Sequence, residues 1–127
     1  MTTLSIAKPV TFIMTRNRKA SVAFYGETLG VAYQHTDDFS AVFDLSGTPL
    51  RITEVADFTP HAHPVLGFQV ADVEACVKTL SGKGVQFAIY EGMGQDALGI
   101  WTSPDGKRKL AFFSDPDGNV LILSQRD

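Results

Sequence analysis

The chain lacks three features that would assign it to particular classes of protein. It has 127 residues and one cysteine, Cys76, so it cannot form an internal disulfide, which suits a reducing cytoplasm. Its net charge of −3 provides no basic excess for nucleic acid or an anionic membrane. No apolar run approaches the length of a membrane span, and the first residues lack a signal-peptide core. We therefore expect a cytoplasmic protein with neither nucleic acid nor membrane as its partner.

What the chain does have is a strong hairpin signal near its end. Two apolar runs within 112–123 are joined by Asp115-Pro116-Asp117-Gly118, in which proline sets φ and glycine can take a positive φ. Residues 41–52 repeat the shape: an apolar run, an aspartate, a corner ending in glycine, and a second apolar run. The repeat predicts a chain built from two copies of one unit.

The apolar periodicity gives both copies the same order of elements. In the first copy it predicts a strand over 10–14, a helix over 19–25 capped by Asn17 and ended by Gly30, and strands over 31–36, 39–45 and 50–55. In the second it predicts a strand over 65–70, a helix after Asp72 ended by Gly82 and Gly84, and strands over 85–90, 110–114 and 119–124, with a small hairpin around Trp101. Residues 34–38 and 107–109 are expected to be solvated turns.

Two motifs within this pattern resemble a known family. Phe24-Tyr25-Gly26-Glu27-Thr28-Leu29-Gly30 resembles the FY-x-x-x-LG segment of the vicinal oxygen chelate superfamily, and 113–119 resembles its F-x-DPDGN hairpin. That superfamily contains glyoxalase I, extradiol dioxygenases, and bleomycin- and fosfomycin-resistance proteins. The resemblance covers about residues 8–124 and implies one domain, 1–127, with an α+β fold.

The resemblance also implies how the strands and helices are arranged. Two tandem βαβββ modules, about 8–55 and 63–124 with a linker over 56–62, would each curl into a mixed half-barrel around a shared cleft. Members often dimerise, so a homodimer is expected.

In metal-using members, His, Gln or Glu side chains project from the first and last strands of each module. Counting along the chain from the glycines and aromatic residues of the motifs gives the corresponding positions here. They are Val10, Val65, Ile122 and either Arg51 or, with a slip of one residue, Ile52. None of these side chains is a metal ligand. We therefore expect no metal and no cofactor.

Strand alternation on this register selects the side chains that face the expected cleft. The candidate ligand-binding residues are Phe12, Met14, Arg51, Thr53, Gln69, Trp101 and Ser124. Gly67 is expected to leave room beside them. Arg51 is either the partner of an anionic group or a surface arginine, and Trp101 is either a lid or a loop anchor. The set suits an apolar or aromatic ligand bearing an anionic group; no catalytic residue is assigned.

Histidines offer weaker candidates. His61 and His63 have the spacing that places two imidazoles on one side of a strand, and His63 with Glu54 is a possible displaced metal site; the alternative is a solvated linker. Tyr33 and His35 are expected to share one face of their strand, either to contact a ligand or to line the sheet.

The sequence thus favours a metal-free small-molecule-binding protein of the bleomycin-resistance type, which sequesters its ligand in the cleft between modules. The alternative is a glyoxalase-like metal-dependent lyase or isomerase, or a dioxygenase, with an atypical site at His63 and Glu54. A third possibility is a degenerate module used for dimerisation or sensing.

Overall fold

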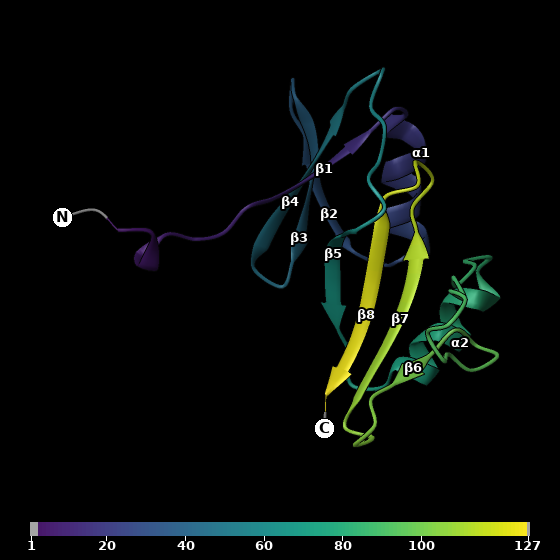
Figure 1. Ribbon diagram of the computed structural model, residues 1–127. Helices are drawn as coiled ribbons and strands as arrows, with labels where there is room; N and C mark the ends of the chain where they lie inside the picture. Colours follow the sequence, from purple (N-terminus) through teal and green to yellow (C-terminus); the bar gives the residue numbers. More distant parts are fainter. Residues whose placement is uncertain (1–2, 127) are drawn as a thin grey trace. The chain divides into compact units, whose positions relative to one another are not determined.

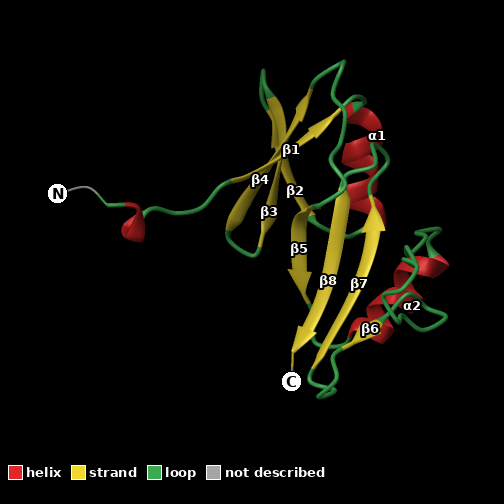
Figure 2. Cartoon of the chain, in the orientation of Figure 1, coloured by secondary structure: helices red, strands yellow, loops and turns green. Residues whose placement is uncertain are grey.

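A computed structural model describes residues 3–126. The chain divides into two compact units, Met1–Phe58 and Thr59–Asp127, and the boundary falls within the expected linker. Each unit combines helices with one four-stranded mixed sheet, so the α+β fold of two βαβββ modules is confirmed (Figure 2). Among the described residues, no helix is both long and apolar enough to span a membrane.

The first unit has the strand order β1-β4-β3-β2, in which β1 and β4 are parallel and the other pairs are antiparallel (Figure 1). Its elements are η1 (Leu4–Ile6), β1 (Thr11–Thr15), α1 (Arg18–Ala23), the π-helical η2 (Phe24–Thr28), β2 (Ala32–Thr36), β3 (Ser40–Leu45) and β4 (Thr48–Glu54).

The helical segment of this unit follows the sequence signals closely. Asn17 caps α1 by accepting a hydrogen bond from the Ala20 N–H at 3.1 Å, as predicted. Gly30 follows the helical segment with a φ of 74°, a conformation that glycine adopts without steric cost. Tyr25, from η2, is fully buried and packs against Phe43 on β3, which fixes the helices on one face of the sheet.

The second unit has the strand order β5-β8-β7-β6, in which β5 and β8 are parallel. Its elements are β5 (Pro64–Gln69), α2 (Val73–Gly82), β6 (Trp101–Thr102), β7 (Arg108–Ser114) and β8 (Val120–Arg126). The predicted cap is again present, since Asp72 accepts from the Ala75 N–H at 3.1 Å. Lys107–Lys109 is not only a turn, because Arg108 begins β7.

The prediction of a strand over 85–90 was wrong. Within that segment only Phe87 pairs with another strand, through an isolated antiparallel bridge to Phe113 on β7. The regular fourth strand is instead the short β6, which pairs with the other end of β7 through Trp101 and Leu110. The edge of this sheet is therefore divided between two short segments.

The side chain of Gln95 explains why residues 85–90 need no ladder. Its Oε1 accepts from the Tyr90 N–H at 2.7 Å, and its Nε2 donates to the carbonyls of Ala88 at 2.9 Å and Gly99 at 2.8 Å. The Gln95 side-chain amide thus forms hydrogen bonds with backbone groups that would otherwise need a neighbouring strand. These hydrogen bonds connect the two ends of the loop.

The predicted hairpin between β7 and β8 is confirmed in detail. Gly118 has a φ of 91°, and its N–H donates to the Asp115 carbonyl at 3.0 Å. Oδ1 of Asp115 accepts from the Asp117 and Asn119 N–H groups, and its Oδ2 accepts from Asn119 Nδ2 at 2.8 Å. All three side chains are buried, so the turn is part of the core of this unit.

Candidate functional site

Cross-strand pairing sorts the side chains of the first sheet onto two faces. The face that carries Phe43 and meets Tyr25 is its helix face; we call the opposite one the first open face. Directly paired residues project to the same side of a sheet. The first open face therefore carries two rows across the strands, Phe12–Arg51–Val42–His35 and Met14–Thr53–Ser40.

This pairing settles the register of β4. Ile52 pairs with Ile13 and Ala41, and all three are buried on the helix face. Arg51 therefore lies on the first open face, and the register with Ile52 at that position is wrong. Four of the predicted ligand-binding residues, Phe12, Met14, Arg51 and Thr53, are brought together as two adjacent pairs on this face.

The β1 edge of the first open face is apolar and accessible. Phe12 is 64% exposed and Met14 is 47% exposed. Their strand neighbour Ile13 is buried, as the alternation of a half-covered strand requires. Two large apolar side chains side by side in solvent are typical of a binding surface rather than of an ordinary strand.

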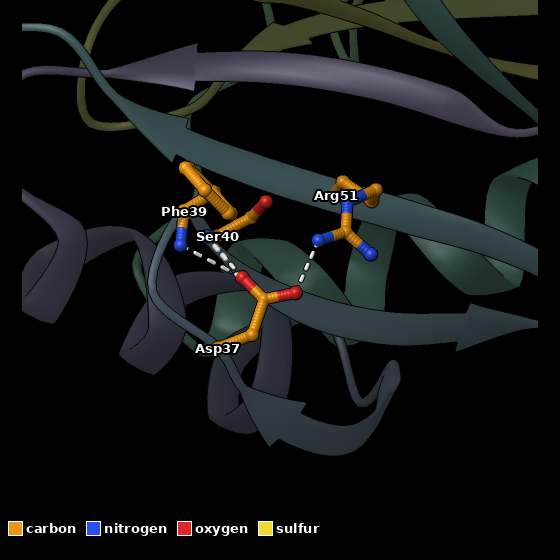
Figure 3. A network of polar contacts seen from close by, with 4 residues as sticks. All are labelled: Asp37, Phe39, Ser40 and Arg51. Carbon is orange, nitrogen blue, oxygen red and sulfur yellow. Dashed lines mark hydrogen bonds and ion pairs between the residues drawn. The ribbon is translucent and has the colours of Figure 1, made fainter.

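Arg51 is already engaged within its own unit. Its Nη2 donates to Oδ2 of Asp37, in the turn between β2 and β3, and the two side chains are 28% and 34% exposed (Figure 3). The other carboxylate oxygen of Asp37 accepts from the N–H groups of Phe39 and Ser40, both at 2.8 Å. Asp37 thus holds the guanidinium in one orientation.

These contacts lower the pKa of Asp37 to about 2. The hydrogen bonds from Phe39 and Ser40 are the largest causes, followed by the hydrogen bond from Arg51. The expectation of a solvated turn over 34–38 missed the structural role of this aspartate. The sequence did contain an indication of it, because an aspartate two and three residues before the N–H groups of a following strand can form an Asx turn.

Tyr33 and His35 do not share a face as predicted. A β-bulge lies between them, because Tyr33 pairs with Phe43 whereas His35 pairs with Val42, the next residue along β3. Tyr33 therefore packs against the Phe43 ring on the helix face, with centroids 5.4 Å apart, and His35 lies on the first open face. The extra residue reversed the alternation on which the prediction depended.

The second sheet also has a face opposite its helix, which we call the second open face. One continuous row crosses all four strands on it, Gln69–Ser124–Leu110–Trp101. The three remaining predicted ligand-binding residues, Gln69, Ser124 and Trp101, lie in this row. Trp101 is held by β6 rather than by a free loop, although its strand is only two residues long.

Gly67 does not leave the space that was expected beside these residues. A Cβ built on Gly67 would lie 3.0 Å from Cγ2 of Ile122, its partner on β8. The isoleucine side chain therefore occupies the room above the glycine. Val65 also departs from simple alternation, because the pairing shifts between Pro64 and Leu66 and leaves it in a bulge.

The residues at the four expected metal positions do not fit a divalent cation. Val10 precedes β1, Val65 lies in the bulge, Ile122 covers Gly67, and Arg51 carries a positive charge. Hydrocarbon and guanidinium supply no lone pair for a metal. Within residues 3–126, no group of three or more His, Cys, Asp or Glu side chains is placed to hold a metal ion.

The atypical metal site was expected at Glu54 and His63. Glu54 pairs with Thr15, on the same face as Ile52, and its Oε1 accepts from the Arg18 N–H at 2.9 Å at the start of α1. His63 stacks on His61 with ring centroids 5.3 Å apart, in the bend before β5 rather than on a strand. Glu54 is therefore engaged at the start of a helix, and the histidines pair with each other.

Comparison with known proteins gives the family. Residues 7–123 match the family described as Glyoxalase/Bleomycin resistance protein/Dioxygenase superfamily. A search of curated proteins found no significant match.

Solved structures agree on the fold. A protein assigned to the glyoxalase family from Bacillus anthracis is 17% identical, with a TM-score of 0.76 over 100% of both chains. A superfamily member from Sphaerobacter thermophilus is 21% identical, with a TM-score of 0.75 over 97% of this chain and 100% of that one. A glyoxalase family protein from Enterococcus faecalis is 21% identical, with a TM-score of 0.69 over 94% and 95% of the two chains. Because the family model matches residues 7–123, the chain belongs to the glyoxalase/bleomycin resistance protein/dioxygenase superfamily.

Proposed function

We propose that this protein binds a small apolar or aromatic molecule through the open faces of its sheets and sequesters it without a metal. The observation that carries the proposal is the pair of exposed side chains Phe12 and Met14 on β1, next to Arg51 and Thr53 on β4. A flat apolar ligand placed there would remove both side chains from water, which favours binding by about 1.5–3 kcal/mol for each side chain fully buried.

The absence of suitable donors at the expected metal positions supports a binding protein over an enzyme of the lyase, isomerase or dioxygenase classes. In those classes the superfamily resemblance implies an ion held by imidazole and carboxylate groups. Here Glu54 accepts a backbone hydrogen bond at the start of α1. That hydrogen bond occupies Oε1 of Glu54 and orients the carboxylate toward the start of α1.

Arg51 contributes as an oriented donor in this proposal. Because Asp37 accepts from Nη2, the remaining N–H groups of the guanidinium are available for a polar group of the ligand. The ion pair reduces the net charge that Arg51 can offer to an anion. Its expected role is therefore to fix the position of the ligand more than to supply the main electrostatic attraction.

The test uses Nile red, a neutral apolar dye whose fluorescence rises in an apolar site. Phe12→Ser and Met14→Ser should each weaken its binding about tenfold, in line with the loss of one buried apolar contact. Leu4→Ser is the matched control, because Leu4 is 88% exposed and lies outside the sheet. Equal binding by all three variants and the wild type would contradict a ligand site on the first open face.

Metal analysis of the purified protein tests separately the proposal that it functions without a metal. We expect no stoichiometric nickel, zinc, manganese or iron, and unchanged Nile red binding after chelation. One bound ion per chain, lost in Glu54→Gln or His63→Gln, would favour the metal-dependent enzyme instead.

We also propose that the protein forms a homodimer, as members of its superfamily often do. Light scattering across a dilution series should give twice the chain mass of 13.8 kDa. A single species of one chain mass at all concentrations would contradict the dimer without affecting the binding proposal.

A further inference from the structure

The second unit contains a pocket of about 380 Å³ at the end of its sheet, where the β6–β7 turn meets the last residues of β8. Its volume is within the range of small-molecule sites. It is lined by Trp101, Ser103, Asp105, Lys107, Arg108 and Arg126. All six of these described residues belong to the second unit.

Two arginines face each other in this pocket. Arg108 on β7 and Arg126 on β8 are direct cross-strand partners, an arrangement in which like charges repel and destabilise a sheet. Within residues 3–126, neither guanidinium forms an ion pair with a carboxylate. An anion placed between them would relieve the repulsion and could bind both guanidiniums at once.

Among the described residues, Asp105 supplies the carboxylate that lines the pocket, and it does not neutralise both arginines. Oδ1 of Asp105 accepts from Ser103 Oγ at 2.6 Å and from the Lys107 N–H at 3.0 Å, which closes the β6–β7 turn. These two hydrogen bonds, in that order, lower the pKa of Asp105, and the charge of Arg108 lowers it further. Within residues 3–126, Lys107, Arg108 and Arg126 outnumber this negative charge, so the described lining has an excess of positive charge.

Trp101 supplies a flat apolar surface beside the arginines. It pairs with Leu110, which lies two residues after Arg108 on β7 and therefore on the same face of the sheet. An indole ring is a good platform for stacking an aromatic ring. The pocket thus joins an aromatic surface to a paired cationic group.

We infer that this pocket binds the anionic end of a small aromatic acid, with its oxyanion between Arg108 and Arg126 and its ring against Trp101. The inference rests on the proposed small-molecule binding and assigns the chemical class of the ligand. It also moves the anion from Arg51, which Asp37 already neutralises, to two arginines that lack such a partner.

Trp101 makes the test direct, because it is the single tryptophan of the chain. Benzoate and phenylphosphonate should quench its fluorescence saturably. Benzamide, which has the ring without the charge, should bind about tenfold more weakly, as expected for the loss of a charged hydrogen bond. Inorganic phosphate alone should also bind more weakly than phenylphosphonate, because it cannot stack on the indole.

Arg108→Gln and Arg126→Gln should each weaken benzoate binding about tenfold. Lys109→Gln is the matched control: it removes one positive charge from the same strand, but Lys109 pairs with Thr102 and Gln125 and so projects from the other face. Its affinity for benzoate should equal that of the wild type. Since the arginine variants remove a repulsion, denaturant unfolding should show that they are at least as stable as the wild type.

Three results would overturn the inference: no saturable quenching by either acid, equal binding of benzamide and benzoate, or equal losses in Arg108→Gln and Lys109→Gln. The proposed function is tested by Nile red and Phe12→Ser, so the two can fail separately. If benzoate binding is lost in Phe12→Ser and kept in Arg108→Gln, the first open face binds the acid and the assignment to this pocket is wrong.

Discussion

Arg51 on β4 and Asp37 in the β2–β3 turn form an ion pair within the first unit, and the same aspartate accepts two backbone hydrogen bonds. One carboxylate therefore closes a turn and orients the arginine on the first open face (Figure 3). The pair links the local structure of a turn to the polar part of the candidate site.

The first prediction concerns the pH dependence of this carboxylate. The pKa of Asp37 is lowered from 3.8 to about 2 in the folded protein, so its contribution to stability is complete above the unfolded value and is lost as pH falls toward the folded one. Asp37→Asn should therefore be less stable than the wild type at neutral pH, and the difference should shrink as the pH falls below about 4.

Urea unfolding across this pH range measures the effect. Asp38→Asn is the matched control, because it changes the adjacent aspartate, whose side chain forms no hydrogen bond within residues 3–126. The contrary result is that the free energies of unfolding of Asp37→Asn and the wild type differ by the same amount at every pH tested. That result would show that the ionised carboxylate is not the source of the stability.

The second prediction concerns the buried turn between β7 and β8. Asp115→Ala removes the acceptor of three hydrogen bonds and leaves the N–H groups of Asp117 and Asn119 buried without it. We expect a loss of about 2–4 kcal/mol in the free energy of unfolding. Asp105→Ala, in the exposed β6–β7 turn, should cost clearly less, because water can replace its hydrogen bonds. Similar losses of unfolding free energy in both variants would show that the burial of the Asp115 hydrogen bonds does not matter.

The third prediction concerns the close approach of β5 and β8. Gly67→Ala would place a methyl group 3.0 Å from Cγ2 of Ile122, so that side chain must move, at a cost of about 1–3 kcal/mol. In an Ile122→Ala background the same substitution should cost nearly nothing, which a double-mutant cycle of unfolding free energies would show.

Gly82→Ala provides the comparison for this cycle. A Cβ at Gly82 meets no atom within 4 Å, and the residue ends α2, so alanine should be neutral or slightly stabilising. If Gly67→Ala costs the same with and without Ile122, the strain has another origin.

The fourth prediction concerns the loop fastened by Gln95. Gln95→Glu keeps the acceptor for the Tyr90 N–H but loses both N–H donors to the Ala88 and Gly99 carbonyls. We expect about 1–3 kcal/mol of local destabilisation, because a charged group would face two carbonyl oxygens. Hydrogen exchange should become faster in residues 88–100 and stay unchanged in α2. Glu91→Gln, in the same loop, should leave exchange as in the wild type.

The features that sequence predicted correctly depend on neighbours in the chain. Asn17 and Asp72 cap their helices, Gly30 follows the first helical segment, and the Asp115–Gly118 turn forms with the expected conformation. Each is governed by hydrogen bonds and backbone angles within about five residues, so the amino-acid order contains the needed information. The family motifs lie in these same segments.

The features that it missed depend on segments distant in the chain. The bulge that separates Tyr33 from His35, the Ile122 methyl above Gly67, and the Gln95 side chain in place of a strand each require knowledge of which residues become neighbours. Register has the same origin: the sequence favoured Arg51 and left Ile52 open as a slip of one residue, and the pairing of β4 with β1 and β3 then assigned the two to opposite faces.

The amino-acid order alone therefore predicted two copies of one unit, because caps, turns and apolar periodicity are local, and its two motifs indicated the superfamily by resemblance. Only the tertiary structure decided which side chains share a face. It paired Arg51 with Asp37 and set Arg108 opposite Arg126, because alternation reverses with a single-residue shift in pairing and only long-range packing selects the register.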